Sequence, residues 1–208
     1  MVSCGALINI RDGVLIAFPK NADTEACIIP DCVKRIGDLA FYRAHNLKRV
    51  TFLDGLLEIG HGAFLSCDHL TAIDLPDSVY KVEDSAFGGN SDVEYLHISA
   101  GLTEIVDNFD GLGISELEIP ESVKRTERSF STLMNLTEVV IPGSVNTISR
   151  NSSSFYKNLA SITIPAGVTD IGSSFAGCAG TLVIRVEPGS FAEQYCRDHQ
   201  LNYEYIPE

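Results

Sequence analysis

The segment from Leu70 to Asp92, LTAIDLPDSVYKVEDSAFGGNSD, decides the fold because most of the chain repeats it with variations. Ile73 and Leu75 form an alternating apolar pair, and Val79 and Val82 supply two further apolar positions. A proline follows the first apolar cluster, and an Ala-Phe pair follows the second. This order of residues is the template for the other units.

The template recurs at intervals of 21 to 23 residues along the chain. The units begin at Thr24, Leu47, Leu70, Val93, Ile114, Leu136, Leu159 and Thr181. The positions three, five, nine and twelve residues after each start form four apolar columns, in which Thr126 is the polar exception and Cys27 the cysteine. Such columns do not arise by chance in an ordinary domain, so the chain is built from internal repeats.

A period near 23 residues indicates one supersecondary element per unit, which buries its apolar face only by stacking on its neighbours. The apolar residues three and five positions into each unit have period two, which predicts a strand with one buried face. The proline that follows, as at Pro76, ends strand pairing because it has no amide donor. The apolar residues at positions nine and twelve then place a second side of the coil against the core. An aromatic residue near position sixteen fills a third side, and this column contains Phe41, Phe64, Phe87, Phe109, Phe130, Phe155 and Phe175.

These motifs resemble the BspA-like leucine-rich repeats, the treponemal subclass of the leucine-rich repeat family. The resemblance rests on ITIPAGVTDIG at 162–172, IGHGAFLSC at 59–67 and IGDLAF at 36–41, and it covers roughly residues 24–187. It implies an α/β-type repeat solenoid, mostly β and irregular coil, that is right-handed and curved with a parallel sheet on one face. It also implies a protein-binding or adhesive module, since many members are bacterial surface proteins that bind host or partner proteins.

The sequence departs from the family pattern at a few positions. Leu53 and Ser99 stand in place of the proline, the unit at 93–113 is short, and Thr126 occupies a core column. We expect local irregularities in curvature at these places, within an otherwise intact family fold.

Both ends of the chain carry sequence signals of a cap on the solenoid, so we expect one domain over residues 1–208. Residues 1–23 are predicted to form a hairpin cap, with strands at Ala6–Ile10 and Val14–Phe18 joined across an Asp-Gly turn. The repeats then occupy 24–187. Residues 188–208 are predicted to form a second cap. Its helix opens on the capping box Ser190-x-x-Glu193, has an apolar face of Phe191, Ala192, Tyr195 and Cys196, and is followed by a strand at Asn202–Ile206.

Composition and charge exclude several classes of partner. The chain of 208 residues has 15 Lys and Arg against 28 Asp and Glu, a formal net charge of -13, which argues against nucleic acid. No stretch approaches 18 apolar residues, so we expect no membrane insertion. The start of the chain lacks the pattern of a secretory leader. The localisation therefore stays open: cell surface or secreted if a leader was removed, cytoplasmic otherwise.

The sequence contains no catalytic, metal or cofactor motif, so we expect no enzyme, no metal site and no cofactor. The histidines fall at different positions of the repeat and do not form a ligand column. Cys27 lies in a buried strand column, Cys67 and Cys178 lie at a corner, and Cys196 lies on the apolar side of the predicted helix. With no Cys-x2-Cys pair, free structural thiols are favoured over disulfides.

Function is therefore expected on the outer face of the predicted sheet, where the side chains between and beside the buried strand positions point to solvent. Exposed aromatic residues beside charges suit protein recognition, although a solvated face without a partner is the alternative for any single residue. The candidate protein-binding residues are Arg49, Thr51, Asp74, Tyr95, His97, Glu116, Glu118, Glu138, Thr163 and Arg185. We interpret the chain as a non-catalytic protein-binding module, a bacterial cell-surface or secreted adhesion protein; the alternative is an intracellular scaffold that organises a protein complex.

Overall fold

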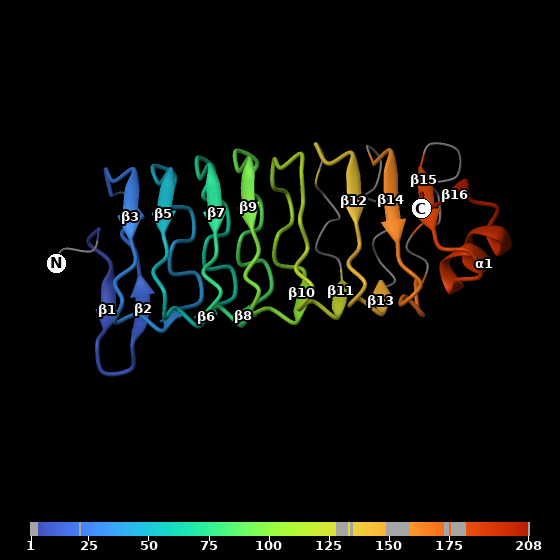
Figure 1. Cartoon of the computed structure of the whole chain (residues 1–208). Helices are drawn as coiled ribbons and strands as arrows, with labels where there is room; N and C mark the ends of the chain where they lie inside the picture. The colour runs from blue at the N-terminus through green and yellow to red at the C-terminus, as the bar shows by residue number, and fades with distance from the viewer. Residues whose placement is uncertain are drawn as a thin grey trace.

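The protein is a β-solenoid in which short strands of successive coils lie side by side along two rows (Figure 1). The computed structural model describes residues 4–20, 22–127, 133, 135–148, 159–172, 175 and 182–207. Most of the described chain is strand, turn and irregular coil, with one short helix near the C-terminus. This is the architecture that the repeat predicts.

The first row contains the strands predicted by the alternating apolar pair. They are β3 (Ala26–Ile28), β5 (Arg49–Thr51), β7 (Ala72–Asp74), β9 (Tyr95–His97), β12 (Glu138–Val140), β14 (Ser161–Ile164) and β15 (Val183–Val186). Within this row β3 pairs with β5, β7 with β9, and β12 with β14 and β15 in turn. Each pair is parallel with equivalent repeat positions opposite each other, as in Cys27 with Val50 and Ile73 with Leu96. The ladder therefore confirms the register that the sequence indicates.

One predicted strand of this row does not form. Residues 116–118 are coil between β9 and β12, and Leu117, expected in a buried column, is only half-buried. This interruption directly follows the short unit 93–113, which is 21 residues long. Strand pairing needs matched positions in adjacent coils, and a shortened coil loses that match.

The second row is a set of short strands that, apart from the predicted hairpin strand β2, form where the sequence predicts a turn. Its members are β2 (Val14–Ala17), β4 (Arg35–Ile36), β6 (Glu58–Ile59), β8 (Lys81–Val82), β10 (Glu104–Val106), β11 (Arg125–Glu127) and β13 (Thr147–Ile148). Gly60 N donates to Ile36 O and Glu83 N donates to Ile59 O, each at 2.9 Å. Stacking places these backbone groups opposite one another, and buried backbone groups must pair. The described pairing joins β2, β4, β6 and β8 in one sheet and β10, β11 and β13 in another.

The core is a column of stacked phenylalanine rings. Ring centroids of Phe18, Phe41, Phe64, Phe87 and Phe109 follow one another at 4.9, 4.6, 5.1 and 5.7 Å, all in stacked geometry. The predicted aromatic column is confirmed at Phe41, Phe64, Phe87, Phe109 and Phe175, all of them buried. Phe18 of the N-terminal hairpin extends the column by one ring. Phe130 and Phe155 lie outside the described residues.

Two small side chains fill the corner beside this column. Asn90 Oδ1 accepts a hydrogen bond from Cys67 N at 2.7 Å, and Asn90 Nδ2 donates to the carbonyls of Phe64 and Phe87 at 2.9 and 2.8 Å. Cys67 Sγ donates to Phe41 O at 3.1 Å. Both side chains are fully buried, so the corner is held by side-chain bonds to the backbone of neighbouring coils.

At the N-terminal end, β1 (Leu7–Asn9) pairs antiparallel with β2, which forms the predicted hairpin. β2 also pairs in parallel with β4 and so continues the second row. The apolar side chains of the first repeat coil are thereby covered by the hairpin.

At the C-terminal end, α1 (Phe191–Asp198) begins at the predicted cap, because Ser190 Oγ accepts from Glu193 N at 3.2 Å. Ala192, Tyr195 and Cys196 are buried as expected, whereas Phe191 is 45% exposed and does not belong to the apolar face. The helix is followed by β16 (Tyr203–Tyr205), which pairs in parallel with β15.

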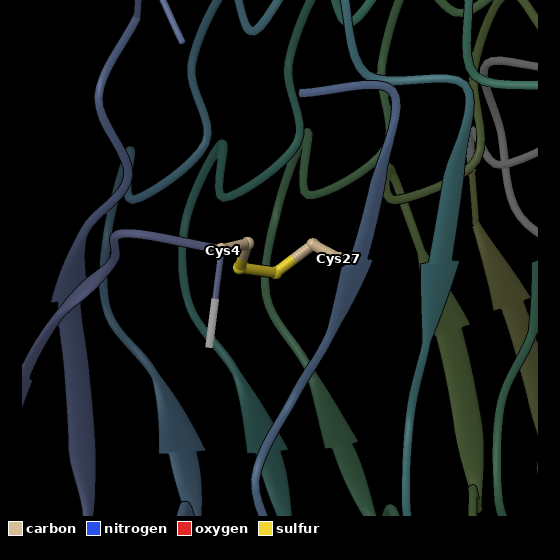
Figure 2. The surroundings of a disulfide bond; sticks show 2 residues. All are labelled: Cys4 and Cys27. Carbon is tan, nitrogen blue, oxygen red and sulfur yellow. A yellow bond between two sulfur atoms is a disulfide. The ribbon is translucent and has the colours of Figure 1, made fainter. Parts of the chain in front are cut away.

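A disulfide bond joins Cys4 to Cys27, with the two Cα atoms 5.2 Å apart (Figure 2). This corrects the expectation of a free thiol at Cys27, although the predicted burial of Cys27 is confirmed. Cys4 precedes the repeats, and only the folded hairpin brings it back to the first strand of the sheet. Cys32, Cys67 and Cys196 are free, the first exposed and the others buried. Cys178 lies outside the described residues.

Candidate functional site on the sheet face

The exposed surface of β5, β7 and β9 is the candidate site, and it will be called the sheet face. Each strand buries its middle residue, and alternation along the strand turns the flanking side chains outward. The structure thus places Arg49, Thr51, Asp74, Tyr95 and His97 on one surface, all of them exposed.

Tyr95 is the centre of this sheet face. Its side chain is 55% exposed and borders two shallow depressions. The first, of about 250 Å³, lies toward β5 and is bounded by Arg49, Thr51 and Asp74 among others. The second, of about 300 Å³, lies on the far side of Tyr95 and is bounded by His97 and Glu118 among others. An aromatic ring between two hollows is suited to a partner that fills both.

Charged side chains surround the ring. His97 Nδ1 lies 3.0 Å from Asp74 Oδ1, so the two side chains hold each other in place across neighbouring strands. Arg49 contributes a cation to the first depression and Glu118 an anion to the second. The sheet face therefore offers both signs of charge around an aromatic centre.

Glu138 belongs to a different cluster from Tyr95. Arg185 pairs with Glu138, and Arg185 Nε lies 2.8 Å from Glu204 Oε1. Ser161 Oγ donates to Glu138 at 3.0 Å. The bonds from Ser161 and Arg185 lower the pKa of Glu138 below its usual range. Glu138 and Arg185 are thus engaged with each other, beyond the coil segment that interrupts the strand row.

The remaining predicted residues lie around these two groups. Glu116 is exposed on the coil segment and does not border either depression. Thr163 is half-buried on β14, next to Val140 of β12 in the ladder. Glu118 borders the same depression as Tyr95 and His97, whereas Glu116, Glu138, Thr163 and Arg185 border neither depression.

Sequence reasoning missed several residues that border the depressions. Phe52 stands five residues into its unit, where the repeat predicts burial, but it is half-buried and bounds the hollow toward β5. Asp77 and Pro120, from the loops after their apolar pairs, bound the other hollow. The signal for Phe52 was Leu53, which replaces the proline that ends the strand in other units. The places of Asp77 and Pro120 at the hollow depend on how their loops fold, and the repeat pattern does not predict them.

The sheet face presents an aromatic ring and charged side chains. Over the residues that the structure describes, no group of three or more His, Cys, Asp or Glu side chains could hold a metal ion. The described helix is too short and polar to cross a bilayer. The arrangement can bind by aromatic contact, hydrogen bonds and charge.

Comparison with known proteins gives one family match. The model of the BspA type leucine rich repeat region matches residues 16–129 and 106–189, with six copies of the repeat. No curated protein matches the sequence.

Solved structures share the fold. The pneumococcal vaccine antigen PcpA superposes with a TM-score of 0.55 and 19% identity, over 98% of this chain and 46% of PcpA. The T. pallidum leucine rich repeat protein TpLRR gives 0.50 and 22%, over 94% and 91% of the two chains. A leucine-rich repeat protein from Eubacterium ventriosum gives 0.55 and 23%, over 84% and 61%. The chain thus spans less than two thirds of PcpA and of the E. ventriosum protein.

Proposed function

Because the chain belongs to the BspA-type leucine-rich repeat family, it is a protein-interaction module, and we propose that it is a non-catalytic cell-surface or secreted adhesion protein that binds its partner through the sheet face. The family match supports interaction with a protein. The adhesion role and the position of the site are our inference.

The observation that carries the proposal is Tyr95, an exposed tyrosine between two hollows that are rimmed by charged side chains. Tyrosine is enriched at the energetic centres of protein interfaces, because it buries a large rigid surface and keeps a polar end. The mixed charges of Arg49, Asp74 and Glu118 give the rim the polar character that surrounds such centres.

The disulfide between Cys4 and Cys27 supports an extracellular location. Disulfides form and persist in oxidising compartments and are rare in the cytosol, where thiols are kept reduced. The bond therefore favours the adhesion protein over the alternative, an intracellular scaffold, which we retain as the rival outcome of the test.

The site is tested by photo-crosslinking. A photoreactive phenylalanine replaces Tyr95 in one variant and Tyr80, an exposed tyrosine outside the sheet face, in a matched control. We expect a crosslinked partner protein from position 95 and none from position 80. Equal yields from the two positions would place binding elsewhere.

The compartment is tested by protease treatment of intact source cells followed by antibody detection. Cleavage on whole cells is expected for the adhesion protein. Protection until lysis would overturn the surface location and select the scaffold.

A further inference from the structure

The two depressions beside Tyr95 differ in the charge that they offer to a partner. Arg49 borders the first depression and takes part in no ion pair within the residues that the structure describes. Glu118 borders the second depression and, over the same described residues, is likewise outside every ion pair. An unpaired cation and an unpaired anion therefore stand on opposite sides of one aromatic ring.

The other charged groups around the ring are engaged. Asp74 Oδ1 lies 3.0 Å from His97 Nδ1, so these two side chains face each other. Asp77 Oδ1 accepts a hydrogen bond from Ala100 N at 2.9 Å, and its carboxylate adds negative charge to the second depression. The charge that is available to a partner is therefore positive in the first depression and negative in the second.

The strand register sets the distance between the two charges. Ala72 stands opposite Tyr95 in the ladder, and Arg49 has the equivalent place in β5, so the short side chain of Ala72 leaves the first depression open. Glu118 has the repeat position of His97, two residues further along the strand direction, in the coil that follows β9. With about 4.8 Å between strands and about 3.3 Å per residue, the backbones of Arg49 and Glu118 are about 16 Å apart.

The formal charge of the chain also changes sign along the solenoid. Residues 1–50 contain seven Lys and Arg against five Asp and Glu, whereas residues 51–208 contain eight against 23. The strand that carries Arg49, β5, lies near the N-terminal end (Figure 1). The polarity across the sheet face thus agrees with that of the whole chain, and such a field orients a charged partner before contact.

On the basis of the protein-binding function proposed above, we propose that the sheet face binds an extended segment with an acidic and a basic side chain four residues apart. The acidic side chain lies against Arg49, and the basic side chain lies against Glu118. Every second side chain of an extended segment points to the same side, and residues four apart span about 13 Å. The length of a Lys or Arg side chain covers the remaining distance. The residue midway between the two charges then faces Tyr95.

The test is an NMR titration of the ¹⁵N-labelled full chain with two peptides of identical composition and net charge. The charged residues are four apart in Ac-Glu-Ser-Leu-Ser-Lys-amide and adjacent in Ac-Ser-Leu-Ser-Glu-Lys-amide. We expect saturable shifts at the amides of Arg49, Tyr95 and Glu118 with the first peptide. Affinity for the second should be about fivefold weaker, because adjacent charges reach only one of the two depressions. Equal affinity for both peptides, or no shift at these amides with either, would overturn the proposal.

Exchange of the two charges assigns each end of the segment. Arg49→Glu should weaken the first peptide about fivefold, because the acidic side chain then meets a like charge. Addition of Glu118→Arg restores two opposite charges in exchanged places, so the peptide should bind turned end for end, with affinity close to that of the wild type. Both side chains are exposed, so the fold is expected to persist. No recovery of affinity in the double variant would overturn the assignment.

A matched control comes from the same part of the chain. Glu121 is an exposed carboxylate that borders neither depression, so Glu121→Gln should leave the affinity for the first peptide unchanged. A loss equal to that of Arg49→Glu would show that only the net charge matters, which would overturn the proposal.

Failure of this charge pattern can be told apart from failure of the site. A crosslink from position 95 together with equal affinity for both peptides would keep the sheet face as the binding site and overturn the charge pattern. No crosslink from position 95 together with no peptide shifts would overturn both.

Discussion

A disulfide bond joins Cys4 to Cys27 in the first repeat strand, and the two residues are 23 positions apart in the sequence, which is one repeat length. Cys4 is on the segment that enters the hairpin, and Cys27 is the buried centre of β3. The bond therefore fastens the N-terminal hairpin to the first repeat coil.

Replacing Cys4 with serine should lower the free energy of unfolding by about 3 kcal/mol, because the closed loop no longer restricts the unfolded chain. Urea denaturation under non-reducing conditions measures the loss. Cys32→Ser is the matched control, since Cys32 is free and exposed, and it should change stability by less than about 0.5 kcal/mol. Equal stability of the two variants would show that the bond does not hold the hairpin.

Ile141 and Val140 are adjacent residues with opposite environments, 4% and 56% exposed. Ile141→Asp should cost about 3 to 5 kcal/mol because it buries a charge without a partner. Val140→Asp, its neighbour on the solvent side, should be nearly neutral. Denaturation of both variants provides the comparison, and a similar loss at both positions would contradict the strand register.

Combined replacement of Tyr95, His97 and Glu118 with alanine should weaken binding of the crosslinked partner at least about tenfold, because the aromatic centre and its charged rim are lost. The thermal midpoint should hardly change, since all three side chains are exposed and the surface pair of His97 with Asp74 contributes little. Binding assays and thermal unfolding on the same protein check both halves. A large loss of stability would mean that these side chains are packed.

Burial raises the pKa of the Cys67 thiol to about 12 and that of Cys196 to about 11. The thiolate is the reactive form, so at pH 8 iodoacetamide should label Cys32 first and the two buried thiols only after denaturation. Peptide mass spectrometry after timed labelling measures the order. Rapid native labelling of Cys67 would contradict its burial.

The raised pKa of Cys67 also makes the free energy of unfolding depend on pH. Between the ordinary thiol pKa of 9.0 and about 12, the folded Cys67 keeps a proton that the unfolded chain releases. The contribution of the Cys67 thiol to the free energy of unfolding is therefore complete below pH 9 and is lost as the pH rises toward 12. Cys67→Ala, which copies Ala44 of the preceding coil, should remove this part of the slope.

The repeat predicted which side chains of the candidate site are exposed, because the outward positions on a strand are fixed once its buried positions are known. Tyr95, His97, Asp74 and Arg49 are exposed on neighbouring strands as expected. Glu138 lies outside the group of side chains around Tyr95. The short unit interrupts the strand row, and Glu138 bonds to Arg185 and Ser161 instead.

The repeat, the register of the sheet and the phenylalanine column follow from the amino-acid sequence alone, because stacked coils must place like residues beside like residues. The second strand row beyond β2, the bond of Cys4 to Cys27 and the buried Asn108 oxygen without a hydrogen-bond partner became visible only in the folded chain. These depend on backbone pairing and on contacts between different positions of the repeat. A column of similar residues does not predict such contacts, because they form where the sequences of the coils differ.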